Sequence, residues 1–115
     1  MLFRSMLSDK LSAYMGFAAK AGALQTGYNT SLLLIKRRKV RLLIVAEDAS
    51  DNTKKKMTQK CASNNVECRI FGTKESLSHV TGKKESSVFI LTDRNFSKII
   101  REEIDRNQSE REVFL

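Results

Sequence analysis

Five consecutive apolar residues, Leu42-Leu43-Ile44-Val45-Ala46, stand between a basic segment and the carboxylates of Glu47 and Asp48. A short apolar run of this kind is typical of a strand that is buried on both faces, in the middle of a sheet covered by helices. This strand therefore favours a fold in which helices are layered on both sides of a sheet.

The rest of the chain alternates between helix-like and strand-like segments. Leu11, Met15 and Ala18 recur at helical spacing, and Tyr14 and Phe17 fall in the same apolar stripe, so we expect both rings in the core. Further strands are predicted at 23–26, 66–70 and 88–91. Residues suited to helix caps mark the predicted helix starts, which are Ser8 or Asp9, Asn29 or Thr30, the cluster 50–53, Gly72-Thr73, and Thr92 or Asp93.

This alternation, with connections of a few residues, predicts an α/β protein: a three-layer α/β/α sandwich around a mixed or mostly parallel sheet of about four strands. A chain of 115 residues fits one domain spanning residues 1–115. We expect its core at about 7–106, and we expect the polar tail 107–115 to fray.

Basic residues are concentrated in the first half of the chain. The whole chain carries 21 Lys or Arg and 13 Asp or Glu, for a formal net charge of +8. Residues 1–60 hold 12 of the basic residues and 4 of the acidic ones, so the entire excess belongs to this half. Such asymmetry attracts polyanions or anionic surfaces, although a solvated face that only aids solubility has the same composition.

Two clusters carry most of this charge. The basic run, Lys36-Arg37-Arg38-Lys39, follows a predicted helix, and phosphate binding explains four consecutive cations better than a solvated loop does. Lys54-Lys55-Lys56 falls in the first turn of another predicted helix, where the helix dipole disfavours cations. A local rule broken without evident gain points to a functional role.

The segment Gly27-Tyr28-Asn29-Thr30 opens a predicted helix. Gly27 permits either a positive φ or a close approach of RNA. Asn29 is predicted to cap the helix, to contact a base, or to do both, because the free N–H groups of a helix start point at any nearby phosphate.

Several classes of protein are disfavoured. The chain shows no secretory signal and no apolar stretch near the roughly 20 residues that cross a bilayer, so we expect a cytoplasmic protein with no membrane contact. Cys61 and Cys68 lack a metal-site spacing and are expected to be small buried hydrophobes. The single histidine, His79, is expected at the surface or at a helix end.

Glu47, Asp48 and Asp93 follow predicted strands, where carboxylates ligate magnesium in phosphotransfer sites. The chain lacks a Gly-rich phosphate loop and a positioned nucleophile, so hydrogen bonds to loop amides are the favoured role. We therefore predict a protein that is not an enzyme and has no catalytic residues, no metal site and no cofactor. A magnesium-dependent phosphotransfer enzyme is the alternative.

The order of several short segments matches a known family. They include Gly27-Tyr28-Asn29-Thr30, the strand 42–46 and Ala46-Glu47-Asp48-Ala49. Together they resemble the kink-turn RNA-binding family of ribosomal proteins, which includes large-subunit proteins of the L-seven-Ae and L-thirty-e type. Further segments, which resemble the bacterial YlxQ-like branch, are Asn52-Thr53-Lys54-Lys55-Lys56, Cys61, Asn65-Val66, Phe71-Gly72-Thr73-Lys74-Glu75, Leu77-Ser78-His79 and Thr81-Gly82-Lys83.

The resemblance spans about residues 7–104 and implies a three-layer fold that binds a kinked RNA helix. In the family, a helix opening with Gly-x-Asn-Glu enters the widened groove at the kink. Its Asn and Glu read tandem sheared G·A pairs, and a Lys one turn later holds a phosphate. Gly27 and Asn29 match this pattern, whereas Thr30 replaces the common Glu and Leu33 replaces the common Lys.

In the family a second contact surface comes from the loop before the last strand, here residues 82–87. The predicted function is recognition of kink-turn RNA, ribosomal or regulatory, by a monomer that has the ribosome as a further partner. The alternative is a ribosome-associated protein-interaction module that binds RNA only through non-specific electrostatics. The predicted RNA-binding residues are Gly27, Asn29, Thr30, Lys36, Arg37, Arg38, Ser50, Lys54, Lys83, Lys84 and Ser86.

Overall fold

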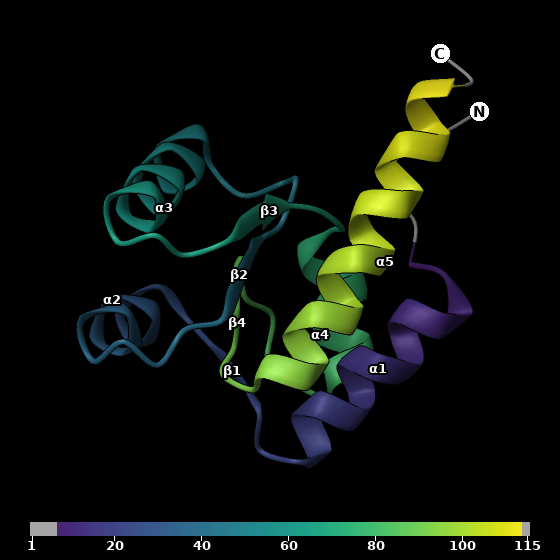
Figure 1. Ribbon diagram of the computed structural model, residues 1–115, viewed down its shortest axis with the longest axis horizontal. Helices are drawn as coiled ribbons and strands as arrows, with labels where there is room; N and C mark the ends of the chain where they lie inside the picture. Colours follow the sequence, from purple (N-terminus) through teal and green to yellow (C-terminus); the bar gives the residue numbers. More distant parts are fainter. Residues whose placement is uncertain (1–6, 114–115) are drawn as a thin grey trace.

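Helices and strands alternate along the chain in the computed structural model, which describes residues 7–113, with side chains described as far as residue 108. The alternation follows the sequence prediction (Figure 1). The elements in chain order are α1 (Asp9–Lys20), β1 (Leu24–Thr26), α2 (Tyr28–Lys36), β2 (Leu42–Val45), α3 (Asp51–Ser63), β3 (Cys68–Ile70), α4 (Lys74–Thr81), β4 (Val88–Leu91) and α5 (Arg94–Val113).

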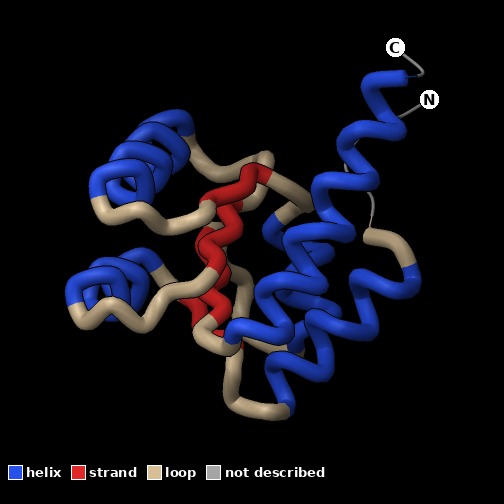
Figure 2. The backbone as a smooth tube through the Cα atoms, in the orientation of Figure 1, coloured by secondary structure: helices blue, strands red, loops and turns tan. Residues whose placement is uncertain are grey.

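The four strands form one mixed sheet in the order β1-β4-β2-β3. β4 runs antiparallel to both β1 and β2, while β2 and β3 are parallel. α2 and α3 cover one face of this sheet, and α1, α4 and α5 cover the other (Figures 1 and 2). The predicted α/β/α sandwich with a four-stranded mixed sheet is therefore confirmed.

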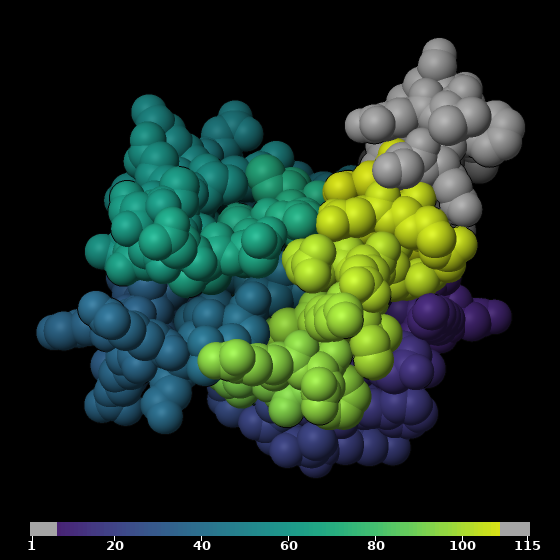
Figure 3. Space-filling view, viewed as in Figure 1, coloured from purple at the N-terminus to yellow at the C-terminus, as the bar shows by residue number. Residues whose placement is uncertain are grey.

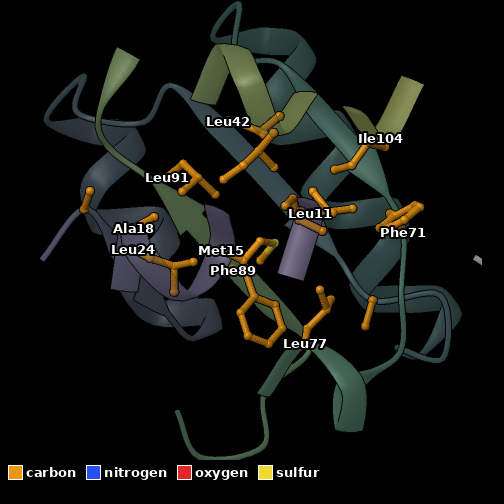
Figure 4. Close-up of a cluster of buried hydrophobic side chains, with 14 residues drawn as sticks. Leu11, Met15, Ala18, Leu24, Leu42, Phe71, Leu77, Phe89, Leu91 and Ile104 are labelled. Atoms are coloured by element: carbon orange, nitrogen blue, oxygen red, sulfur yellow. The ribbon is translucent and has the colours of Figure 1, made fainter. Parts of the chain in front are cut away.

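β2 is buried on both faces, as its apolar run predicts. Leu42 and Ile44 join the core beneath α1, α4 and α5 (Figure 4), whereas Leu43 and Val45 join the core beneath α2 and α3. All four side chains are fully buried. Because successive side chains of a strand point to opposite faces, an unbroken apolar run is what a strand between two helical layers requires.

Four helices begin with the side-chain caps that the sequence indicates. Ser8, Ser50 and Asp93 accept hydrogen bonds from backbone N–H groups in the first turns of α1, α3 and α5. Thr73 and Ser76 form a reciprocal capping box at the start of α4. These caps satisfy N–H groups that have no partner within the helix.

α2 begins differently, and the prediction of Asn29 or Thr30 as its cap is wrong. The helix starts at Tyr28, and its N-cap residue is Gly27, which offers no side chain for a hydrogen bond. The Gly27 N–H donates to the Val88 carbonyl (3.0 Å), and Gly27 has φ 112° and ψ 147°. The chain therefore turns from β1 into α2 at a single residue, in a conformation essentially reserved for glycine.

The expectation that both rings of α1 lie in the core is wrong for Phe17 and is confirmed in part for Tyr14, which packs against the core. Phe17 is 54% exposed and meets the half-buried Tyr14 edge-to-face, with ring centroids 6.1 Å apart. The stripe of α1 that faces the core is narrower than predicted because only Leu11, Met15 and Ala18 are buried along the helix.

The polar tail predicted to fray, residues 107–115, continues α5 as far as Val113, and residues 114–115 lie outside the described part of the chain. The Gln108 side-chain amide donates to the Ile70 carbonyl at the end of β3 (3.1 Å), which holds this part of the helix to the sheet edge. A tertiary contact of this kind leaves no local signal in the sequence.

Candidate nucleic-acid interface

The start of α2 presents free backbone donors. The first hydrogen bond of the helix runs from the Ser31 N–H to the Gly27 carbonyl (3.0 Å). The N–H groups of Tyr28, Asn29 and Thr30 therefore precede the hydrogen-bond ladder of the helix and point out of its end. Since no side chain caps α2, this is a place where a helix end attracts an anion.

One face of α2 is exposed along its whole length. Asn29, Leu33 and Lys36 are exposed and, being four and three residues apart, lie on the same face. Leu33 is 45% exposed, which is high for a leucine. Ser31 and Ile35 are buried on the opposite face, where they anchor the helix to the sheet. The exposed face thus connects the start of α2 with the basic run at its end.

Three loops that carry predicted site residues meet at one end of the sheet. Because β4 runs antiparallel to β1 and β2, its first residue lies beside the last residues of both strands. The Gly27 N–H donates to the Val88 carbonyl (3.0 Å), and the Ala46 N–H donates to the Ser87 carbonyl (2.9 Å). We call this end of the sheet, where β1 and β2 end and β4 begins, the α2 end. The segments that meet here contain Gly27, Asn29, Thr30, Ser50, Lys54, Lys83, Lys84 and Ser86.

The two predicted serines serve the fold of these loops. The Ser50 hydroxyl accepts from the Thr53 N–H and caps α3. The Ser86 hydroxyl donates to the Val88 carbonyl and accepts from the Val88 N–H, which fixes the turn into β4. These hydroxyls are therefore engaged in shaping the loops.

The cations of the α2 end differ in their freedom to bind an anion. The partly buried Lys54 lies 3.9 Å from the fully exposed carboxylate of Asp51. Lys84 is exposed and Lys83 is partly buried in the loop before β4. The lysines of this loop are thus better placed than Lys54 to reach a partner.

The structure does not bring the basic run to the α2 end. Lys36, Arg37 and Arg38 are exposed at the opposite end of α2, and a helix of nine residues is about 13 Å long. Arg38 has φ 58°, and its N–H donates to the Ile35 carbonyl (3.0 Å). The Lys39 N–H donates to the Leu34 carbonyl (2.9 Å), which completes a Schellman ending of α2. An arginine therefore occupies a left-handed position that usually belongs to glycine.

The carboxylates considered as magnesium ligands are separated. Asp48 accepts from the Lys74 N–H (2.9 Å), and Asp93 caps α5. Asp93 follows β4, which is antiparallel to β2, so it lies at the opposite end of the sheet from Asp48. Both carboxylates thus accept a hydrogen bond from a backbone amide, as predicted, but in each case the N–H belongs to the first turn of a helix rather than to a loop. Among the described side chains, residues 7–108, no group of three or more His, Cys, Asp or Glu is arranged to hold a metal.

The two cysteines interact with each other. Cys61 is buried on α3, and Cys68 is partly buried on β3. A hydrogen bond from the Cys61 thiol lowers the pKa of Cys68, while the same bond, together with burial, raises the pKa of Cys61. Both lie away from the α2 end, and the expectation that they are small hydrophobes is confirmed fully for Cys61 and in part for Cys68.

Three cations that the sequence analysis did not include border an open pocket at the other end of the sheet. Arg94, Lys98 and Arg101 lie on α5, and the pocket also contains Arg41, which directly precedes β2. Their spacing of four and three residues places them on one face of a helix, and this was the signal available in the sequence. The lining residues of this α5 pocket are Arg41, Glu67, Arg94, Ser97, Lys98 and Arg101.

No helix in the described part of the chain is long and apolar enough to cross a membrane.

Comparison with known proteins finds relatives that align with most of this chain. An RNA-binding protein YlxQ from Enterococcus faecium is 34% identical over 97 residues, covering 84% of this chain and 93% of the relative. A protein of the same name from Bacillus subtilis (strain 168) is 30% identical over 83 residues, covering 72% of this chain and 83% of the relative.

Two solved structures resemble this chain over most of its length. The structure of a Bacillus halodurans protein of unknown function has a TM-score of 0.82 and 32% identity, covering 85% of this chain and 99% of that one. A Giardia lamblia 15.5kD RNA binding protein has a TM-score of 0.71 at 21% identity, covering 90% of this chain and 88% of that one, which shows the fold alone. Residues 9–101 match the family described as ribosomal protein L7Ae/L30e/S12e/Gadd45, and the chain belongs to that family.

Proposed function

We propose that this chain is a non-catalytic RNA-binding protein that recognises a kinked, kink-turn RNA helix through the start of α2. Relatives that are 34% and 30% identical are named RNA-binding proteins, which supports the RNA-binding part of the proposal. The observation that carries the kinked-RNA part is the uncapped start of α2, where Asn29 is exposed beside free backbone N–H groups.

The geometry supports different RNA contacts for different groups along α2. The Asn29 amide has both a donor and an acceptor, which suits hydrogen bonds to base edges in a groove opened by a kink. The free N–H groups of the first turn attract a backbone phosphate. Lys83 and Lys84 hold phosphates on one side, and Lys36, Arg37 and Arg38 hold phosphates on the other.

Two departures from the family pattern shape the expected recognition. Thr30 has a hydroxyl that makes one hydrogen bond where a carboxylate would make more, and it stays partly exposed. Leu33 brings no charge to the middle of the exposed face. Lys36, three residues further on, is therefore the first cation on that face.

The RNA in this proposal is ribosomal or a structured regulatory RNA, bound by a monomer in the cytoplasm, with the ribosome as a further partner. The second candidate is a ribosome-associated protein-interaction module that binds RNA through charge alone. The exposed Leu33, at the position where the family commonly has a lysine, is the observation that favours it.

Titration against two RNAs separates these candidates. We expect a duplex with a standard kink-turn to bind at least tenfold more tightly than the same duplex with both G·A pairs made Watson–Crick. That difference is about 1.4 kcal/mol, to be measured at about 0.15 M salt. Equal weak binding to both RNAs, with affinity falling steeply as salt rises, would contradict shape recognition and support the charge-only module.

Arg38→Gly tests the basic run without damage to the fold. Glycine relieves the left-handed strain at this position by about 1 kcal/mol, and the added entropy of the unfolded chain offsets part of that gain. We therefore expect the free energy of unfolding to stay equal or rise. RNA affinity should fall, and the slope of log affinity against log salt should shrink by about one.

Asn65→Gly is the matched control for Arg38→Gly. Asn65 occupies the equivalent left-handed position after α3, with φ 57°, and it carries no charge. Because this variant keeps every cation, we expect it to lose much less RNA affinity than Arg38→Gly and to keep the salt slope of the parent protein. If both variants bind equally well, Arg38 makes no phosphate contact. Chemical denaturation and fluorescence titration supply the two measurements.

A further inference from the structure

The α5 pocket lies at the end of the sheet opposite the α2 end. The Arg41 N–H donates to the Leu91 carbonyl (2.8 Å), which fixes Arg41 beside the last residue of β4, shortly before α5 begins. This places the charge of Arg41 next to those of Arg94, Lys98 and Arg101, and the pocket they border has a volume of about 410 Å³. On the face seen in Figure 3, the yellow-green start of α5 borders the blue segment that leads into β2.

The acidic groups near this pocket are paired with another residue. Glu67 lines the pocket, and its carboxylate lies 3.1 Å from the guanidinium of Arg69. Asp105, one turn after Arg101 on α5, receives two hydrogen bonds from the same guanidinium, at 2.7 and 3.1 Å. Arg69 thus pairs with both carboxylates and offsets one of their two negative charges. The four cations that line the pocket outnumber its one carboxylate, so the lining keeps an excess of positive charge.

A buried hydroxyl in the pocket lacks a partner. Ser97 is only 5% exposed, and among the described residues its Oγ has no hydrogen-bond partner. Other hydroxyls inside helices behave differently, because Thr58, Ser63 and Thr81 each donate to a carbonyl one turn earlier. A buried polar group without a partner is unfavourable, so an acceptor arriving in the pocket would stabilise Ser97.

The pocket is continuous with the basic run. A second pocket, between the ends of α2 and α3, is lined by Arg38 together with Arg41, so Arg41 borders both hollows. Cations therefore extend from the exposed face of α2, through Arg38 and Arg41, to Arg94 on α5. This path passes around the end of the sheet and joins its two helical layers.

We propose that the α5 pocket binds a backbone phosphate of the same RNA, with the Ser97 hydroxyl as donor and Arg41, Arg94, Lys98 and Arg101 as counter-charges. The proposal rests on the proposed RNA-binding function and extends it to the opposite helical layer. A phosphate supplies the acceptor that Ser97 lacks, and arginine guanidinium groups match phosphate oxygens in geometry as well as charge. The stem flanking the kink is the part of the RNA that follows this path.

Two variants of the full chain test the pocket against a kink-turn RNA with a long flanking stem. Arg94→Gln combined with Lys98→Gln should lower the affinity at least tenfold and reduce the salt slope by about two. The matched control combines Lys20→Gln with Lys60→Gln, which removes equal charge from exposed positions that do not line the α5 pocket. We expect the control to stay within about threefold of the parent protein, since it loses only long-range attraction.

Ser97→Ala tests the pocket without changing the charge of the protein. It removes an unpaired buried hydroxyl, so its melting temperature should be equal or higher, while its RNA affinity falls between twofold and tenfold. Affinities equal to the parent for both Ser97→Ala and the double α5 variant would overturn the proposal. A loss as large in the lysine control as in the double α5 variant would also overturn it, because general charge then explains the effect.

An additional Asn29→Ala titration distinguishes failure of the pocket from failure of the proposed function. If Asn29→Ala loses affinity while the α5 variants do not, the pocket is wrong and kinked-RNA recognition stands. If the α5 variants lose affinity while Asn29→Ala does not, the phosphate contact stands and recognition through α2 is wrong. If the parent protein binds no RNA, both proposals fall.

Discussion

Asn29→Ala is expected to weaken binding to a kink-turn RNA at least tenfold, while binding to the Watson–Crick control duplex stays unchanged. An amide that makes two hydrogen bonds to a base edge contributes about 1–3 kcal/mol of discrimination. Asn29 is exposed, and the other described residues make no hydrogen bond with its side chain, so its loss should leave the fold intact. Titration of both RNAs, with a thermal melt of the variant, supplies the measurement.

Asn95→Ala is the matched control for this substitution. Asn95 carries an exposed amide in the first turn of α5, at the opposite end of the sheet from the start of α2. We expect its removal to change neither RNA affinity nor stability. Parent-like binding of kinked RNA by Asn29→Ala would contradict base recognition by the start of α2, whatever the affinity of the protein for RNA in general.

Gly27→Ala is expected to have the largest combined effect on stability and binding. At φ 112° and ψ 147°, any residue other than glycine is strained by about 1–3 kcal/mol. Space is not the obstacle, because an added Cβ would lie 3.6 Å from the nearest atom, the Thr30 hydroxyl oxygen. Relief of the strain would rotate the start of α2, so affinity for kinked RNA should also fall at least tenfold.

Gly22→Ala is the control for Gly27→Ala, because it introduces backbone strain without changing the start of α2. Gly22 also has a positive φ, 74°, with no atom within 4 Å of an added Cβ, and it lies in the turn between α1 and β1. We expect it to cost about 1 kcal/mol in the free energy of unfolding without affecting RNA binding. If Gly27→Ala retains full RNA affinity despite its lower stability, the geometry of the α2 start is not what recognises RNA.

Local chemistry made much of the fold predictable from the sequence. The apolar run of β2 identified a strand between two helical layers, because neither face of such a strand meets water. Ser8, Ser50 and Asp93 marked helix starts correctly, since a cap acts on N–H groups two or three residues away. The start of α2 was misplaced because the hydrogen bond between Gly27 and Val88 joins residues far apart in the chain.

The candidate site residues could be identified from the sequence, but their grouping in space could not. The sequence identified Asn29, Lys84 and Arg38 as candidates from residue type, but it did not show that the first two belong to one end of the sheet and Arg38 to the other. The antiparallel pairing of β4 with β1 and β2 decides this, because it brings loops distant in the chain to the same edge.

The sequence places the excess positive charge in the first half of the chain. In the structure, cations from both halves lie side by side. The second half of the chain has no net charge, yet Arg94 and Lys98 on α5 lie beside Arg41 from the first half. By itself, the sequence determined the elements, the α/β class and the basic character of the protein, because these depend on residue type and short-range periodicity. Only the tertiary structure decided which end of the sheet holds each cluster and which hydroxyls are already engaged, because both depend on strand pairing between residues distant in the chain.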